Sequence, residues 1–358
     1  MTEFKTIGKS KQFYDFLKSE ILSGEYKPND KFPSIRELAQ KYNISTVTVN
    51  SVISSLVAEG YLYVEQGKGT FVKEVKNDRR KGKKMIGVMF FDFCLENNIE
   101  ATMFNSIQEN LKDDYYLIPY NTYDDVQNFY KGLRGFTDLE VDGLILVPPA
   151  SEAYDQDIVR SLIPKNIPVV FINRKISSVP ADFLGMDFEA ATYIAVKHIL
   201  QQGRQNVLLI RYSSPSISEN MTRGYIKAYK ELGLPVDTNL IIDWPKTNDG
   251  IDNRFKEKYT NILKNKQYVN GLVASDILIY KYRKSLHEAN REVPKDLSIV
   301  SINDTVYSRF MEPPLTTVPF PSAEIGQKAV KIIIDRIEGK KYEYIHEYIV
   351  KDLIKRKS

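Results

Sequence analysis

From Met85 to the C-terminus, the sequence alternates between short apolar runs and stretches with helical periodicity. The runs at 86–91, 141–147 and 167–172 are apolar at nearly every position, and the stretches between them place apolar residues every three or four positions. A strand without polar positions is buried on both faces, as in a parallel sheet covered by helices. The same alternation resumes after residue 190 and predicts, among others, a helix at 278–290. We therefore predict an α/β fold with two lobes, each built on a parallel sheet.

The length and composition exclude several classes of protein. The chain has 358 residues, 42% of them hydrophobic, which is enough for two or three domains with buried cores. No apolar run reaches the roughly 18 residues that cross a bilayer, so we expect a cytoplasmic protein without membrane segments. A single cysteine, Cys94, and three scattered histidines, His198, His287 and His346, form neither a disulfide nor a metal cluster. We expect no metal, no cofactor and no catalytic residue.

The charge is distributed unevenly along the chain. Residues 1–84 hold 16 Lys and Arg against 10 Asp and Glu, whereas the remainder holds 34 against 36. The positive excess therefore lies entirely in the first quarter of the chain. A basic segment joined to a nearly neutral body indicates a module that binds a polyanion, although a basic tail without a partner would show the same charge.

This basic segment contains three predicted helices and the signals that start them. Residues 11–22 have apolar side chains at helical spacing. Ser34, with Glu37 three positions later, forms a capping box that begins the second helix. Ser45 is placed to cap a third helix at 46–59. Two helices joined by a tight turn, the second with a polar exposed start, predict a helix-turn-helix.

A predicted hairpin follows the third helix. Two runs rich in β-forming residues, 61–64 and 70–72, flank a turn that contains Gly67, Lys68 and Gly69. Glycines allow a close approach of the backbone to a phosphate chain, and the lysine supplies charge. A nucleotide-binding loop is disfavoured, because the spacing matches neither nucleotide motif and no helix follows the turn.

Four segments of this region resemble the winged-helix domain of GntR-family transcription regulators. They are FPSIRELA at 32–39, ISTVTV at 44–49, EGY at 59–61 and QGKGTFV at 66–72. The resemblance covers about 70 residues and implies binding to double-stranded operator DNA. It places DNA contacts on Arg36 in the second helix, on Ser45, Thr46, Thr48 and Asn50 in the third, and on Gln66, Gly67 and Lys68 in the wing.

Two of these positions depart from the family. Many members carry arginine where this chain has Thr46 and Asn50. Arginine reads guanine in a bidentate way, whereas asparagine pairs best with adenine and threonine offers a hydroxyl and a methyl group. The departure predicts a shifted base preference. The alternative is that both residues touch only phosphates, as at least half of protein–DNA hydrogen bonds do.

A linker separates the winged helix from the body. Residues 73–84 contain mostly charged residues and no periodic apolar pattern. We therefore expect a DNA-binding domain at 1–72, a basic linker at 73–84, and an effector-binding and dimerisation domain of two lobes at 85–358.

Polar residues follow the predicted strands of the body. Open parallel sheets bind ligands outside the carboxyl ends of their strands. Planar polar groups there can satisfy paired hydroxyls, and aromatic faces can cover the C–H surface of a sugar. Each residue alone could instead be a cap or a turn former. The residues at these ends are Phe90, Phe91 and Asp92, then Asn173 and Arg174, then Arg211, then Ser275 and Asp276, then Asn303 and Asp304.

The body resembles the effector domain of the lactose and galactose repressor family, which is similar to periplasmic sugar-binding proteins. The motifs are VDGLI at 141–145, IPVV at 167–170, SD at 275–276, VPKDLSIV at 293–300 and PPLTTV at 313–318. The resemblance implies effector contacts by Asn173, Trp244, Ser275 or Asp276, and Asn303. Trp244, the only tryptophan, would stack on a sugar ring or simply fill the core. Family members often have an arginine at the place of Met221 and an aspartate at the place of Asn303; Arg211 or Arg223 could substitute for the arginine.

Together these features predict a transcription regulator, most simply a dimeric repressor of palindromic DNA whose affinity a monosaccharide such as arabinose or fucose modulates. A constitutive DNA-binding protein whose body only dimerises is one alternative. A regulator fused to an enzyme-like body is another, but no lysine has the context of a Schiff base and Cys94 has no identifiable histidine partner.

Overall fold

A computed structural model of the chain describes residues 9–22, 25–73, 83–93, 98–244 and 252–358. The chain divides into two compact units, Met1–Lys83 and Lys84–Ser358. Among the described residues, none of the helices combines the length and the apolar character needed to cross a bilayer. The strand β3 begins at Lys84, the residue with which the expected linker ends.

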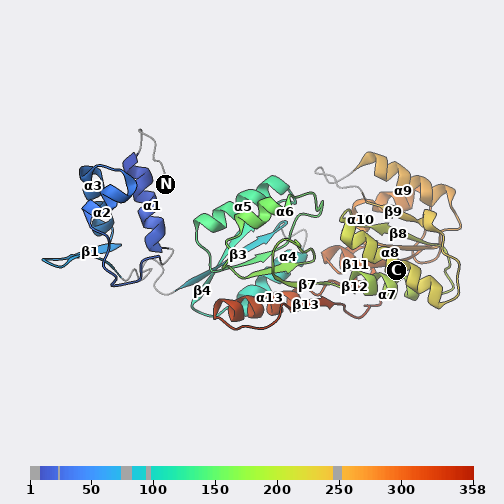
Figure 1. The fold of residues 1–358 in the computed structure, drawn as a ribbon. Helices are drawn as coiled ribbons and strands as arrows, with labels where there is room; N and C mark the ends of the chain where they lie inside the picture. Colours follow the sequence, from blue (N-terminus) through green and yellow to red (C-terminus); the bar gives the residue numbers. More distant parts are fainter. Residues whose placement is uncertain (1–8, 23–24, 74–82, 94–97, 245–251) are drawn as a thin grey trace. The chain divides into compact units, whose positions relative to one another are not determined.

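The first unit is a three-helix domain with a two-stranded wing (Figure 1). Its apolar core forms because α1 and α2 both pack on the inner face of α3, which buries Val49, Val52, Ile53 and Leu56. The strands pair antiparallel, and Lys31 adds a bridge to Phe71. The elements are α1 (Lys9–Leu22), α2 (Ile35–Tyr42), α3 (Thr46–Ala58), β1 (Leu62–Glu65) and β2 (Gly69–Val72).

The second unit contains two lobes, and lobe 1 is built on a six-stranded parallel sheet. Helices α4 and α13 cover one face of this sheet, and α5 and α6 cover the other. The strand order is β13 (His346–Ile349), β7 (Asp182–Met186), β6 (Val169–Ile172), β5 (Gly143–Leu146), β3 (Lys84–Phe90) and β4 (Tyr115–Asn121). The helices are α4 (Asn98–Glu109), α5 (Val126–Asp138), α6 (Gln156–Leu162) and α13 (Ser322–Ile337).

Lobe 2 is built on a five-stranded parallel sheet, with α7 and α8 on one face and the remaining helices on the other. The strand order is β12 (Thr316–Pro319), β11 (Ser298–Asn303), β10 (Gly271–Ser275), β8 (Val207–Arg211) and β9 (Ile241–Asp243). The helices are α7 (Phe188–Leu200), α8 (Pro215–Glu231), α9 (Asn253–Asn265), α10 (Asp276–Lys281), α11 (Arg283–Glu288) and α12 (Val306–Phe310), and a 3-10 turn, Thr238–Leu240, precedes β9.

Three segments connect the lobes. The chain passes from β7 to α7, returns from β12 to α13, and crosses again after β13, so that Ile354 pairs with Thr317 of lobe 2. The predicted α/β class with two parallel sheets is confirmed. In place of the one helix expected at 278–290 there are two short helices. The first, α10, ends at Lys281, and the second, α11, begins at Arg283.

Candidate functional site

The start of α2 is fixed by the predicted capping box. The Ser34 hydroxyl accepts the Glu37 backbone N–H at 3.3 Å, and the Glu37 carboxylate accepts the Ser34 N–H at 2.7 Å. This bond from the Ser34 backbone lowers the pKa of Glu37. Leu38 is buried in the core. Arg36, on the opposite side of the first turn, is exposed, as a DNA contact would require.

The start of α3 uses two of the predicted DNA-contact residues in its own cap. The Ser45 hydroxyl accepts the Thr48 N–H at 3.1 Å and lies 2.8 Å from the Thr48 hydroxyl. These contacts fix where the helix begins and engage both hydroxyls. Thr46 and Asn50 are exposed on the same helix. Ser45 is also exposed, so the hydroxyl contacts of the cap, and not burial, make Ser45 and Thr48 less available to a partner.

The wing ends in a three-residue turn between Glu65 and Gly69. Its residues Gln66, Gly67 and Lys68 are all exposed. Gly67 has φ 78°, a conformation that glycine adopts without strain, and a Cβ there would meet no atom within 4 Å. The Lys68 Nζ lies 2.9 Å from the Glu65 carboxylate but the side chain is 73% exposed. The turn thus presents a narrow tip with one exposed cation.

In lobe 1, a buried glutamate organises the segment after β3. Glu100 accepts the backbone N–H groups of Phe91, at 3.3 Å, and Asp92, at 2.7 Å. Burial raises the pKa of Glu100 to about 7, although the two hydrogen bonds by themselves lower that pKa. Of the predicted contact residues, Phe90 is fully buried in the core, whereas Phe91 and Asp92 are at least partly exposed. Glu100 lies inside α4 and not at a strand end, so the sequence pattern did not single it out.

The end of β6 places an asparagine and an arginine next to each other. Asn173 has φ 62°, and its side-chain oxygen accepts the Met186 N–H at 3.2 Å. The adjacent Arg174 donates from Nε to the Pro148 carbonyl at 2.7 Å. Burial lowers the pKa of Arg174, and three carboxylates oppose that shift. These carboxylates belong to Asp124, Glu100 and Glu152.

In lobe 2, Asp276 is completely buried and its carboxylate accepts three hydrogen bonds. The donors are the Thr305 N–H at 2.5 Å, the Ser308 hydroxyl at 2.9 Å and the Ile277 N–H at 2.8 Å. Burial raises the pKa of Asp276 to about 6, which these bonds counter. These bonds occupy the carboxylate oxygens of Asp276. The two from Thr305 and Ser308 hold the start of α12 in place.

Asn303 and Tyr212 meet at the carboxyl end of the second sheet. The Asn303 amide donates to the Tyr212 hydroxyl at 2.8 Å. Asn303 ends β11 with φ 113°, and Ser275 ends the neighbouring β10; both are buried. Tyr212, one residue beyond β8, was not among the predicted contacts, although its place after a strand was a usable signal.

Arg211 is the last residue of β8, and Trp244 directly follows the neighbouring strand β9. Arg211 donates to Asp243 at 2.8 Å and to the Thr222 hydroxyl at 2.8 Å, so its guanidinium is held within lobe 2. Trp244 is partly buried, and its indole nitrogen has no hydrogen-bond partner among the described residues. The Lys281 ammonium lies 5.9 Å from the centre of its ring. An unpaired buried N–H is costly, so this donor is suited to a ligand acceptor.

One contact joins the two lobes directly. Glu152, in the loop after β5, accepts the Ser214 hydroxyl at 2.6 Å, the Ser216 hydroxyl at 2.6 Å and the Ser216 N–H at 3.2 Å. Ser214 is the N-cap of α8 and makes no side-chain cap bond of its own. The carboxylate of lobe 1 therefore caps a helix of lobe 2. Nothing in the sequence pattern pointed to this pair.

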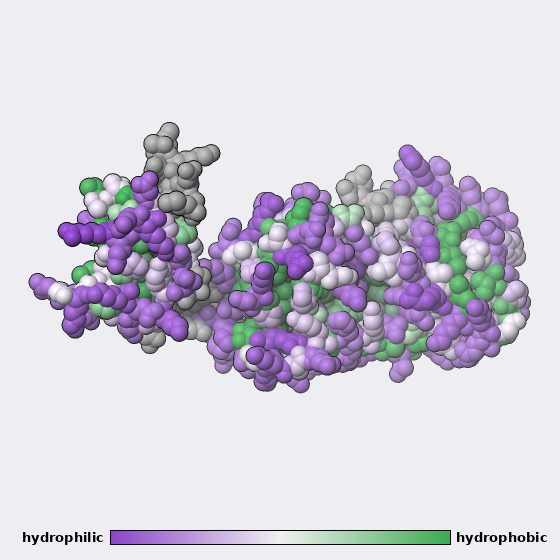
Figure 2. Space-filling model, in the orientation of Figure 1, coloured by the Kyte–Doolittle hydropathy of each residue, from purple (hydrophilic) through white to green (hydrophobic). Residues whose placement is uncertain are grey.

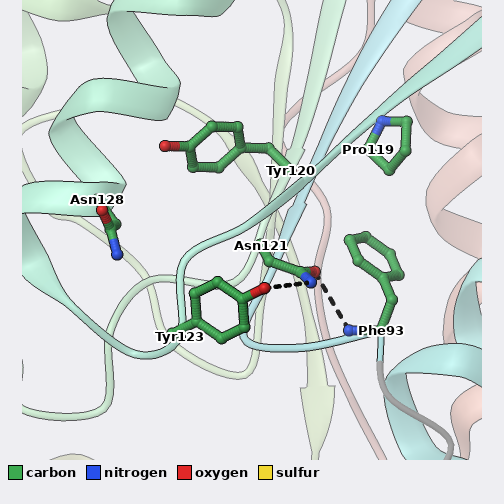
Figure 3. A pocket seen from close by; sticks show the side chains of 6 residues that line it. All are labelled: Phe93, Pro119, Tyr120, Asn121, Tyr123 and Asn128. Carbon is green, nitrogen blue, oxygen red and sulfur yellow. Dashed lines mark hydrogen bonds between the residues drawn. The ribbon is translucent and has the colours of Figure 1, made fainter.

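Two pockets lie outside the predicted residues. One, of about 430 Å³, lies at the end of the edge strand β4 (Figure 3). In it the Asn121 side chain accepts the Phe93 N–H at 3.2 Å and donates to the Tyr123 hydroxyl at 3.4 Å. The other, of about 550 Å³, lies beside Tyr280 and Phe310 in lobe 2. Cys94 lies outside the described residues.

Comparisons with known proteins agree with this architecture. Residues 9–72 match the family described as bacterial regulatory proteins, gntR family. Residues 100–253 match periplasmic binding proteins and the sugar binding domain of the LacI family, and 196–358 match a periplasmic binding protein-like domain.

Two relatives are named arabinose metabolism transcriptional repressors. The protein of Halalkalibacterium halodurans is 29% identical over 90% of this chain and 87% of its own length, and that of Geobacillus stearothermophilus is 26% identical over 99% and 98%. A LacI family regulator from Enterococcus faecium, solved with bound ribose, is 25% identical, with a TM-score of 0.63 over 77% of this chain and 98% of its own. The chain is thus a transcription regulator that joins a DNA-binding domain of the gntR family to a LacI-type, periplasmic-binding-protein-like body.

Proposed function

We propose that this regulator is a sugar-responsive repressor that binds a palindromic operator as a dimer. The observation that carries the proposal is the presence, in one chain, of an exposed helix-turn-helix and a two-lobed body of the LacI type. The names of the two relatives favour arabinose as the effector. Fucose, the other sugar predicted from the sequence, is the next candidate. Access to chromosomal DNA would require a cytoplasmic protein.

The proposed effector contacts come from both lobes. Met221 is fully buried in the core, Asp243 and Thr222 bind the Arg211 guanidinium, and Glu189 binds that of Arg223. We assign the ligand-binding arginine to Arg174, whose described hydrogen bond to Pro148 uses Nε and not the terminal nitrogens. Asn303 supplies an amide, and Trp244 supplies a ring face and an N–H donor without a partner among the described residues. Phe90 and Asp276 would act indirectly, by shaping the lobes, since both are buried and engaged inside them.

The proposed dimer surface lies on lobe 2. Phe310 is 79% exposed, and beside it the rings of Tyr280 and Tyr307 stack at 4.3 Å with Arg283 over Tyr280 at 4.1 Å. Phe310 is exposed and both tyrosines are half-buried, and aromatic residues next to an arginine are typical of the centre of an interface. Replacing Phe310 by Asp should shift the light-scattering mass toward a monomer. The control Tyr268→Asp changes a half-exposed ring elsewhere in lobe 2 and should leave the mass unchanged.

A sugar screen tests the function as a whole. Thermal shift against monosaccharides should show stabilisation by one of them, and that sugar should change operator affinity in fluorescence anisotropy by about five- to 150-fold, the usual range of allosteric coupling. If no sugar stabilises the chain while binding to palindromic DNA persists, the body only dimerises. If neither sugar nor DNA binds, the proposal is wrong.

A further inference from the structure

The recognition helix α3 is unusual in its charge. Its 13 residues, TVTVNSVISSLVA, include no charged side chain. Cations that could contact phosphates lie instead on neighbouring elements, with Arg36 on α2 and Lys68 at the tip of the wing. Contacts to phosphate supply affinity and contacts to base edges supply sequence discrimination. In this domain the two roles are divided between elements, and α3 is left with neutral groups.

Among the described residues of the domain, the most exposed large hydrophobic side chain lies in the first turn of this helix. Val47 is 79% exposed, between Thr46 and Thr48, whereas the valines at 49 and 52 are buried. Figure 2 shows single hydrophobic residues among hydrophilic ones on the drawn face of this unit. A β-branched residue is a weak helix former, and its exposure gains nothing for folding. Val47 therefore serves neither the core nor the helix.

Val47 shares its side of the helix with a residue that favours adenine. Asn50 is three positions further on, so both side chains lie on one face of α3, and both are exposed. In the major groove asparagine bonds the N6 and N7 atoms of adenine, and the only apolar group on any base edge is the 5-methyl of thymine. An exposed valine in this place is matched to that methyl group.

We infer that Val47 reads the 5-methyl group of a thymine next to the base pair that Asn50 contacts, so that α3 selects an A·T-rich half-site. This inference rests on the proposed function, since it requires that the domain binds operator DNA. The inference concerns which base Val47 selects, and not whether the domain binds DNA.

The test uses the full-length protein and a chemical change of one methyl group. Site selection from random DNA gives the preferred operator, and each thymine in it is then replaced by uracil, which removes the methyl and keeps every hydrogen-bonding group. We expect one thymine in each half-site at which this change weakens binding about fourfold, as the loss of one buried methyl implies. The Val47→Ala protein should bind the operator with thymine at that position and the operator with uracil there equally.

A matched control separates this effect from general damage to the helix. Ser51→Ala changes the exposed neighbour on the same turn and should keep the wild-type preference for thymine over uracil. Circular dichroism of Val47→Ala should match the wild type, because the removed side chain is not part of the core. An operator insensitive to uracil, or an alanine variant that keeps the full preference, overturns the inference. Failure of the wild type to select any sequence refutes the proposed function instead.

Discussion

Removal of the carboxylate of Glu152 should weaken effector binding. Its three contacts with Ser214 and Ser216 join the loop after β5 in lobe 1 to the start of α8 in lobe 2. They exist only while this loop and the start of α8 lie within hydrogen-bond distance. A movement that separates the lobes at this point breaks all three. The contact therefore stabilises the arrangement in which both lobes can touch one ligand.

The size of the effect follows from the bonds that are lost. Hydrogen bonds to a charged group contribute about 1.5 to 3 kcal/mol each, but these three share one oxygen of a half-buried side chain, so their sum is well below three times that range. We expect a net loss of about 2 kcal/mol for Glu152→Ala, which raises the apparent Kd of the effector up to about 30-fold. Glu152→Gln keeps an acceptor and should lose about half of this.

Calorimetric titration with the sugar found by the thermal screen measures the affinity, and distances between spin labels on α5 and α9 report the separation of the lobes. Ser216→Ala should weaken binding by itself and add little when Glu152 is already alanine, because both changes remove the same contact. A Glu152→Ala protein with wild-type affinity and an unchanged distance distribution would refute the reasoning.

Three further predictions concern stability and base preference. Gly224→Ala should destabilise the protein by about 1 to 3 kcal/mol, because a Cβ there would lie 2.1 Å from a backbone oxygen of α7, whereas Gly135→Ala, with nothing within 4 Å, should be neutral or stabilising in urea unfolding. Burial raises the pKa of Glu100 from 4.5 to about 7, so its native form binds a proton that the unfolded form releases, and the free energy of unfolding should fall as pH rises through this window. Glu100→Gln should flatten that slope; an equal slope in both proteins would contradict the assignment. Asn50→Arg should move the selected operator toward guanine, and unchanged bases would remove Asn50 from direct readout.

The helix-turn-helix could be predicted closely because its signals are local. The bond between Ser34 and Glu37 spans three residues, and the Ser45 cap also spans three. Both were predicted from spacing alone and both are present. The broken helix after β10 shows the limit of such signals. Its helical periodicity continues to residue 290, but α10 ends at Lys281 and α11 begins at Arg283.

The candidate effector site was predicted only as a set of strand ends. Sequence placed Asn303 and Asp276 there together, but the structure separates their roles, because Asn303 bonds to Tyr212 while Asp276 holds α12. Exposure and the choice of hydrogen-bond partner depend on side chains from other strands, which periodicity does not describe.

The sequence by itself determined the winged helix, the basic charge of the first unit and the parallel α/β class of the body, since caps, turns and hydrophobic period act over a few residues. Only the tertiary structure decided the strand order, the return of α13 and β13 to lobe 1, and the pairing of Ile354 with Thr317. It also decided the contact of Glu152 with Ser214, 62 residues away. These features join segments far apart in the chain, and they form because the apolar faces of both sheets must be covered, which no local signal encodes.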